Sequence, residues 1–200
     1  MRVGTGEARG RKLKSPKTAG TRPITARVKT ALFAILDDEV REAQVLDLFA
    51  GTGSVGIEAL SRGAAHVTFI EMSAKIAGLV RENLRITGFA DRAEVIQADA
   101  FKFLQAYAGD APREQRTYDI IYVAPPQYQE MAARALALLD GSPLVASQGL
   151  VIVQIHPKER PGIIAVPCRR LVLSDERRYG STLLMFYRSV QGGPDEAPSE

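Results

Sequence analysis

One glycine-rich turn constrains the fold of this chain more than any other feature. Gly51, Gly53 and Gly56 have the spacing G-x-G-x-x-G and follow a short apolar run at residues 45–48, which is typical of a buried strand. A helical pattern and a second apolar run come next, and Glu71 follows that run, 20 residues after the first glycine. A strand, a glycine-rich turn, a helix, a second strand and an acid in this order predict a nucleotide-cofactor site.

The rest of the chain continues this alternation of strands and helices. Helices are expected after the N-cap residues Thr25 and Ser73, over residues 54–62 and 100–107, and near 129–140. Further strands are expected at residues 93–97, 118–123, 150–155, 169–174 and 182–188. The alternation predicts an α/β fold with a largely parallel sheet covered on both faces. The last two strands come close together around residues 177–180, with no helix between them, so they should form a hairpin and at least one should run antiparallel.

Asp47 distinguishes between the two cofactor classes that use such a turn. A dinucleotide such as NAD would place its pyrophosphate beside this acid, and like charges repel strongly in a partly dry site. S-adenosylmethionine has no phosphate and carries an ammonium and a sulfonium, so an acid at this position favours it. A carboxylate that only caps the loop is an alternative role for Asp47.

The predicted cofactor contacts extend beyond the turn to the ends of the next two strands. Glu71 is expected to accept from ribose hydroxyls, and Asp99 from the adenine amino group, with the N-cap of the following helix as an alternative role for Asp99. The full predicted set is Asp47, Phe49, Ala50, Gly51, Thr52, Gly53, Glu71, Met72, Asp99 and Ala100.

Charge is distributed unevenly along the chain. Residues 1–29 hold nine Arg and Lys against one Glu, which is +8, whereas the remainder holds 17 basic and 22 acidic residues, which is −5. A basic arm on a mildly acidic body indicates a polyanionic partner, although a solvated terminus is the alternative. The single Cys168 excludes an internal disulfide, and no cluster of His, Cys or acids suggests a metal site. No apolar run approaches the ~18 residues of a membrane span, so we expect a cytoplasmic protein.

Several motifs, taken in order, resemble those of the RsmD-type bacterial 16S ribosomal RNA guanine-N2 methyltransferases. The matching segments are residues 9–13, 21–23, 27–29, 31–33, 46–51, 56–64 and 179–180. The resemblance implies a class I S-adenosylmethionine-dependent methyltransferase sheet, Rossmann-like, of seven strands with an antiparallel last strand. It also implies a basic N-terminal hairpin or arm that engages ribosomal RNA or the small ribosomal subunit. We divide the chain into this arm at 1–23, the methyltransferase domain at 24–190 and a disordered acidic tail at 191–200. The predicted RNA contacts are Arg9, Arg11, Lys12, Lys14, Arg22, Arg178 and Tyr179.

One segment departs from the family pattern. After the fourth strand the family has Asp or Asn, then Pro-Pro and an aromatic residue, whereas this chain has Ala124, Pro125, Pro126, Gln127 and Tyr128. An exocyclic guanine amine is a poor nucleophile, and acceptors on its two N–H groups favour the reacting geometry. Ala124 offers only its backbone carbonyl, so we predict that Gln127 supplies a carboxamide oxygen and that Tyr128 stacks on the base.

Three interpretations of the departure are open. In the first, Gln127 and the backbone preserve the family reaction; in the second, the enzyme methylates a different atom; in the third, the protein binds cofactor and RNA with little turnover. The third is the main rival from another functional class, a non-catalytic RNA-binding or assembly factor. An NAD-dependent oxidoreductase is the second rival.

Overall fold

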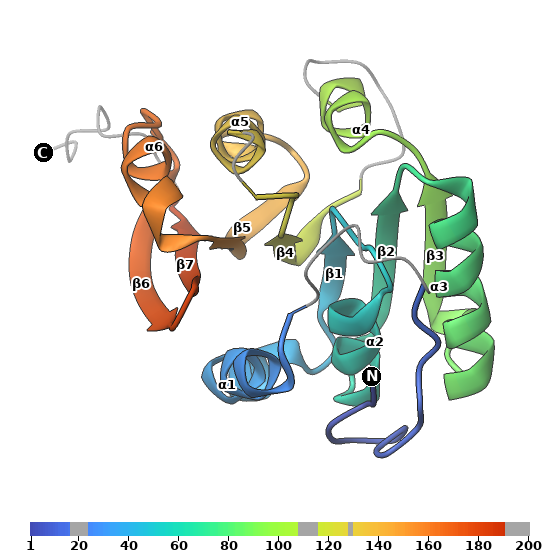
Figure 1. The fold of residues 1–200 in the computed structure, drawn as a ribbon. Helices are drawn as coiled ribbons and strands as arrows, with labels where there is room; N and C mark the ends of the chain where they lie inside the picture. Colours follow the sequence, from blue (N-terminus) through green and yellow to red (C-terminus); the bar gives the residue numbers. More distant parts are fainter. Residues whose placement is uncertain (17–23, 108–115, 128–129, 191–200) are drawn as a thin grey trace, which may run out of the picture. The chain divides into compact units, whose positions relative to one another are not determined.

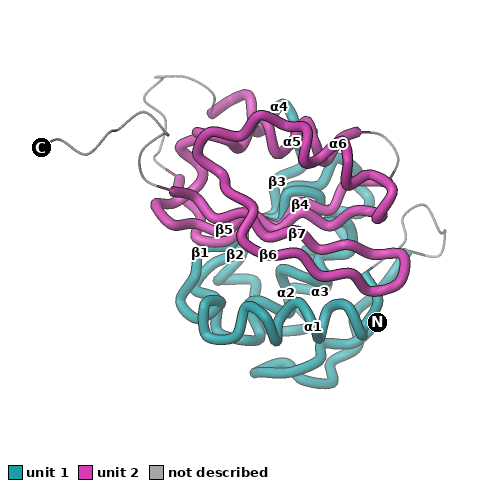
Figure 2. Tube along the Cα trace, turned by 90° about the vertical axis from the view of Figure 1, so that its left-hand side faces the viewer, with its two compact units in different colours: residues 1–102 teal, residues 103–200 magenta. Residues whose placement is uncertain are grey.

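The computed structural model describes residues 1–16, 24–107, 116–127 and 130–190. The chain divides into two compact units, Met1–Lys102 and Phe103–Glu200, which Figure 2 distinguishes by colour. The division of the sequence into an arm, a domain and a tail stays a prediction, and the expected tail at 191–200 lies outside the described residues.

The first unit is built on three parallel strands in the order β3-β2-β1. The strands are β1 (Gln44–Asp47), β2 (His66–Glu71) and β3 (Ala93–Gln97), and Figure 1 shows them side by side. Helix α2 (Ser54–Ser61) packs against β1 and β2, and α3 (Ala74–Thr87) packs against β2 and β3. Because β2 lies between two strands and under two helices, its four central residues are buried, and all but Thr68 are apolar.

The helix ends follow the capping signals in the sequence. Helix α1 (Ala26–Leu36) begins after Thr25, whose side chain accepts from the Val28 backbone N–H, and α3 begins after Ser73, which accepts from Ile76. Gly88 ends α3 in the left-handed conformation. Both predicted N-caps are therefore confirmed. The 3-10 turns η1 (Asp37–Val40) and η2 (Ala90–Arg92) complete this unit.

The second unit carries a mixed set of strands in the order β4-β5-β7-β6. Strand β4 (Tyr118–Val123) is parallel to β5 (Val145–Ile155), and β7 (Thr182–Ser189) is antiparallel to both β5 and β6 (Leu171–Tyr179). The predicted hairpin with an antiparallel last strand is thus confirmed. Helix α5 (Met131–Leu139) packs against β5 and α6 (Arg160–Ile164), and the 3-10 turn η3 (Pro157–Glu159) precedes α6. Helix α4 (Ala100–Ala106) spans the boundary of the two units.

Strands β5 and β6 extend beyond the runs of apolar residues from which they were predicted. Strand β5 begins at Val145 and includes Gln148 at φ 62°. Its pairing with β4 shifts register after Tyr118. The alternation of apolar and polar side chains is therefore lost in this part of the strand. Strand β6 runs on to Tyr179 through polar and exposed residues, since its hydrogen bonds to β7 continue the hairpin. The five-residue helix α6 was not predicted, because it is too short to show a helical period.

The N-terminal segment closes on itself and on the helices of the first unit. Arg2 and Lys12 form a single antiparallel bridge, with turns between them, in place of a longer two-stranded ladder. Val3, Ala8 and Leu13 are each 2% exposed, so this charged segment also contributes to the core. Within the described residues, no helix combines the length and hydropathy needed to cross a membrane.

Candidate cofactor site and catalytic edge

The glycine-rich turn between β1 and α2 requires glycine for two different reasons. Gly51 and Gly53 have φ values of 53° and 75°, in the left-handed region that favours glycine. At Gly56 the φ is ordinary, but a Cβ would lie 2.3 Å from a ring carbon of Phe69, so the helix could not approach β2 so closely. A Cβ at Gly51 would meet no atom within 4 Å. The backbone of the turn is therefore open at the position where a ligand would approach.

Asp47 lies at the end of β1 and is only 2% exposed. Its Oδ2 accepts from the Gly56 backbone N–H at 3.2 Å, so the structure shows the loop-capping contact that was the alternative role. Burial raises the pKa of Asp47 to about 7, the Gly56 hydrogen bond opposes that shift, and the charge of Glu71 adds to it. A buried carboxylate with this pKa is stabilised as an anion by a nearby cation, and it disfavours a phosphate.

Glu71 connects the end of β2 to the turn. Its two carboxylate oxygens accept from the Gly51 N–H at 3.0 Å and from the Ser73 N–H at 2.8 Å. Each oxygen has a second acceptor position, so these bonds are compatible with a ribose contact. That contact stays a prediction.

The other predicted cofactor residues follow the ends of β1, β2 and β3 in the chain. Asp99 accepts from the Lys102 N–H at 2.9 Å, which is the expected N-cap contact, and Ala100 is buried. The ring of Phe49 packs edge-on against Phe101, with 5.9 Å between centroids. Met72 is a large apolar residue that is 69% exposed. The role of these residues in cofactor binding stays a prediction.

Asn83, on α3, is a functional candidate that the sequence reasoning missed. Its side chain is 0% exposed, and its Nδ2 donates to the carbonyls of Thr52 at 3.2 Å and Lys14 at 3.1 Å. Its Oδ1 accepts from the Lys14 N–H at 2.8 Å. One buried amide therefore joins the cofactor turn to the N-terminal segment. The available signal was its position on the apolar face of the helix, beside Val80 and Leu84.

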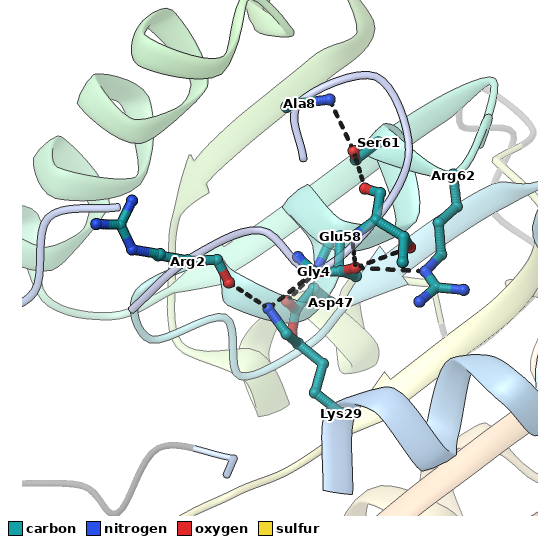
Figure 3. A network of polar contacts seen from close by, with 10 residues as sticks. Arg2, Gly4, Ala8, Lys29, Asp47, Glu58, Ser61 and Arg62 are labelled. Atoms are coloured by element: carbon teal, nitrogen blue, oxygen red, sulfur yellow. Dashed lines mark hydrogen bonds and ion pairs between the residues drawn. The ribbon is translucent and has the colours of Figure 1, made fainter. Parts of the chain in front are cut away.

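A second buried polar network anchors the N-terminal segment on α1 and α2, as Figure 3 shows. Glu58 accepts from the Gly4 N–H at 2.8 Å and the Thr5 N–H at 3.0 Å, and it pairs with Lys29. Burial alone would raise the pKa of Glu58, but these hydrogen bonds and the Lys29 charge together lower it. The Ser61 hydroxyl donates to the Thr5 carbonyl at 2.6 Å. Neither Lys29 nor Glu58 was predicted as part of a site.

These two anchors change the interpretation of the basic segment. Arg11 donates to the Ile86 carbonyl at 2.7 Å, and Lys14 pairs with Glu82, so both cations already have partners. Arg9 and Lys12 are exposed. Arg22 lies outside the described residues. Of the two predicted contacts on β6, Arg178 is exposed with its Nε 3.3 Å from the Gly180 carbonyl, and Tyr179 is half-buried. The predicted RNA contacts stay predictions.

The segment at residues 124–128, whose sequence departs from the family pattern, follows the end of β4 in the second unit. Pro125 is buried, Pro126 is exposed, and Ala124 and Gln127 are half-buried. Tyr128 lies outside the described residues, so its predicted stacking is not described. Gln127 stands in a turn after two prolines, and its role stays a prediction.

A hydrogen bond between β4 and β5 lies beside this segment. The Tyr122 hydroxyl donates to Gln154 Oε1 at 2.6 Å. Tyr122 is 3% exposed, and Gln154 is half-buried. Sequence reasoning missed Gln154, because one polar residue near the end of an apolar strand carries no motif.

Comparison with known proteins covers nearly the whole chain. A family model described as conserved hypothetical protein 95 matches residues 1–188. The ribosomal RNA small subunit methyltransferase D of Escherichia coli strain K12 is 34% identical over 196 residues, which cover 98% of this chain and 93% of that protein.

Solved structures agree with the observed fold. One named "Putative methyltransferase yhhF" from Escherichia coli superposes with a TM-score of 0.80 at 33% identity, covering 95% of this chain and 98% of that chain. An RNA methyltransferase from Salinibacter ruber, solved with S-adenosyl-L-homocysteine, has a TM-score of 0.61 at 16% identity and covers 88% of this chain and 98% of its own. The predicted α/β fold of the class I methyltransferases is confirmed.

Proposed function

Since the chain belongs to the family of ribosomal RNA small subunit methyltransferase D, we propose that it methylates ribosomal RNA with S-adenosylmethionine as donor. More narrowly, the proposed target is the exocyclic N2 amine of a guanine in 16S RNA. The observation that carries the proposal is the 34% identity to a named ribosomal RNA methyltransferase over 98% of this chain.

The donor fits the residues at the turn after β1. S-adenosylmethionine supplies an electrophilic methyl group and carries positive charge without a phosphate. The buried Asp47, whose pKa of about 7 follows from its burial, gains from a neighbouring cation and would repel a pyrophosphate. The open backbone at Gly51 leaves room for the ligand. This combination disfavours the NAD-dependent alternative.

The chemistry required of the protein is placement rather than covalent catalysis. The N2 lone pair is delocalised into the guanine ring, so the amine reacts when acceptors hold both N–H groups and align nitrogen with the methyl carbon. Proximity and orientation can contribute about 7–11 kcal/mol in well-oriented reactions. The carbonyls at Ala124 and Pro125 are the backbone acceptors that this chain offers after β4.

The basic N-terminal segment supports an RNA substrate. Its exposed Arg9 and Lys12 stand on a segment that is held to the body at both Glu58 and Asn83. Cations on an anchored segment lose less conformational freedom when they bind phosphate than cations on a free tail. We expect these contacts to be mostly independent of sequence.

The departure at Ala124 favours one second candidate, a protein that binds cofactor and RNA but transfers methyl to another atom or hardly at all. The test is incubation of the protein with labelled methyl donor and unmethylated small ribosomal subunits, free 16S RNA, or DNA. Nucleoside mass spectrometry then identifies the product, and excess S-adenosylhomocysteine serves as the inhibited control. N2-methylguanosine in the RNA is the expected result, and absence of label from every substrate would contradict the proposal.

A further inference from the structure

The pairing of β4 with β5 determines which residue stands beside Ala124. The two strands are parallel, with Tyr122 opposite Ile152 and Val123 opposite Val153. Ala124 follows β4 directly, and continuation of this register by one residue would bring it opposite Gln154. Paired residues of neighbouring strands project from the same face of a sheet. Continued in this way, the register brings the carboxamide of Gln154 to the position where Ala124 lacks a polar side chain.

Tyr122 holds that carboxamide in place. Tyr122 lies two residues before Ala124, and the alternation along β4, continued by one residue, would put both on the same side of the sheet. Its hydroxyl donates to Gln154 Oε1 at 2.6 Å, a diagonal contact between the strands. Because Tyr122 is 3% exposed, the hydroxyl is fixed by its packing and fixes the rotamer of Gln154 in turn. An amide oxygen accepts two hydrogen bonds, and Tyr122 occupies one of these positions.

We propose that Gln154 supplies the side-chain oxygen that accepts from the target amine, in place of the Asp or Asn that relatives of this pattern carry at position 124. Tyr122 acts as its positioning residue. The inference rests on the proposed function and names the acceptor at the same site. Gln154 is favoured over Gln127 because it is on a strand within the sheet, whereas Gln127 follows two prolines in a turn.

The proposed methyl transfer conserves atoms and electrons. The N2 lone pair forms the new bond to the methyl carbon as the sulfur–carbon bond breaks, and sulfur keeps that electron pair. The nitrogen then carries a positive charge and loses one proton to water. A neutral amide oxygen does not take this proton. It holds the N–H group so that the lone pair points at the methyl, which is an effect on turnover rather than on donor binding.

The experiment compares five variants by the rate of methyl transfer and by calorimetric affinity for S-adenosylmethionine. Gln154→Ala should lower kcat by about 100-fold, the scale on which loss of a single oriented polar contact acts, while donor affinity changes less than twofold. Tyr122→Phe should lower kcat by about tenfold with little change in KM. Gln105→Ala, which alters an exposed glutamine on α4, should match wild type.

Rescue separates an acceptor from a purely structural glutamine. Adding Ala124→Asn to Gln154→Ala returns an amide to the family's position and should recover at least tenfold in kcat. Full activity of Gln154→Ala, or a large loss in Gln127→Ala alone, would overturn the assignment of Gln154 and leave the methyltransferase intact. Wild-type protein without transfer to any RNA would overturn the proposed function, and the assignment with it.

Discussion

Lys29 Nζ lies 2.8 Å from Glu58 Oε2, and both side chains are almost fully buried, at 6% and 1% exposure. The same ammonium donates to the Arg2 carbonyl at 3.1 Å. Glu58 also accepts from backbone N–H groups of the N-terminal segment. This pair therefore joins α1, α2 and the N-terminal segment in a place where water does not replace a lost partner.

Glu58→Gln should destabilise the protein strongly, because it leaves the buried Lys29 ammonium without its counter-charge. Breaking a buried ion pair on one side typically costs about 3–5 kcal/mol. Urea unfolding measures the change in the free energy of unfolding. The matched control is Asp38→Ala, which breaks the exposed pair of Asp38 with Arg41 and should change stability by less than about 1 kcal/mol. Equal effects in the two variants would contradict a buried, energetically important pair.

Two glycines of the N-terminal segment offer a matched pair of substitutions. Gly6 and Gly10 have φ values of 78° and 81°, so alanine strains both backbones alike. A Cβ at Gly6 would lie 1.7 Å from the Ser61 carbonyl oxygen, whereas a Cβ at Gly10 would meet nothing within 4 Å. Gly10→Ala should cost about 1–2 kcal/mol from the backbone alone. Gly6→Ala should cost more and should also speed limited proteolysis within residues 1–14, because the turn must leave Ser61.

The pKa of Asp47 leads to a pH dependence with a definite sign. The pKa is about 7 in the folded protein and 3.8 in the reference state, so the fold favours the protonated acid. Its contribution to stability is present below about pH 4 and is lost as the pH rises to about 7. Asp47→Asn should flatten this part of the stability profile in urea unfolding at pH 5 to 8. A profile unchanged by the substitution would show that Asp47 ionises normally.

Affinity for S-adenosylmethionine should also depend on the ionisation of Asp47, but it should rise with pH over the range in which stability falls. The ionised carboxylate attracts the cationic donor, so affinity for S-adenosylmethionine should rise between pH 5.5 and 7, by up to about tenfold per pH unit. Calorimetry across this range measures the slope. Asp47→Asn keeps an oxygen for the Gly56 N–H and should remove most of the slope, which separates the charge from the loop contact.

Asn83 should affect donor binding without contacting the donor. Asn83→Asp keeps the oxygen that accepts from the Lys14 N–H, but it removes the N–H groups that donate to the Lys14 and Thr52 carbonyls. Each buried group left without a hydrogen bond costs about 1–3 kcal/mol of stability. We expect weaker binding of S-adenosylmethionine, because the Thr52 carbonyl is no longer held. Ser61→Ala, at the other anchor, should leave donor affinity unchanged. Loss of affinity in both variants would indicate general unfolding instead.

The sequence predicts those parts of the molecule whose signal is local. The caps at Thr25 and Ser73 and the hairpin at the end of the chain have near neighbours in sequence as partners, and all are confirmed. The pair of Lys29 and Glu58 joins residues that no periodicity relates. Strand β6 was predicted too short because its outer half has polar side chains, although its backbone continues to pair with β7.

The same distinction applies to the site. The turn from Gly51 to Gly56 has a fixed spacing, so its place between β1 and α2 was predicted, and its role in cofactor binding stays a prediction. Asn83 and Gln154, in contrast, are single polar residues within apolar patterns. Their position depends on the packing of α3 and on the register of β4 with β5. That register is a tertiary property, so the missing amide at Ala124 suggested only its neighbour in sequence, Gln127.

The salt dependence of RNA binding should report which cations of the N-terminal segment contact phosphate. Each contact contributes about −0.7 to −0.9 to the slope of log affinity against log salt, so five contacts give about −3.5 to −4.5. Arg9→Gln and Lys12→Gln should each make the slope shallower by nearly one contact, because both side chains are exposed. Arg11→Gln should do so less, since Arg11 donates to the Ile86 carbonyl. Deletion of residues 1–20 is a poorer test, because it also removes the buried Val3, Ala8 and Leu13. If Arg9→Gln and Lys12→Gln leave the slope unchanged while donor affinity stays normal, RNA binds on another surface.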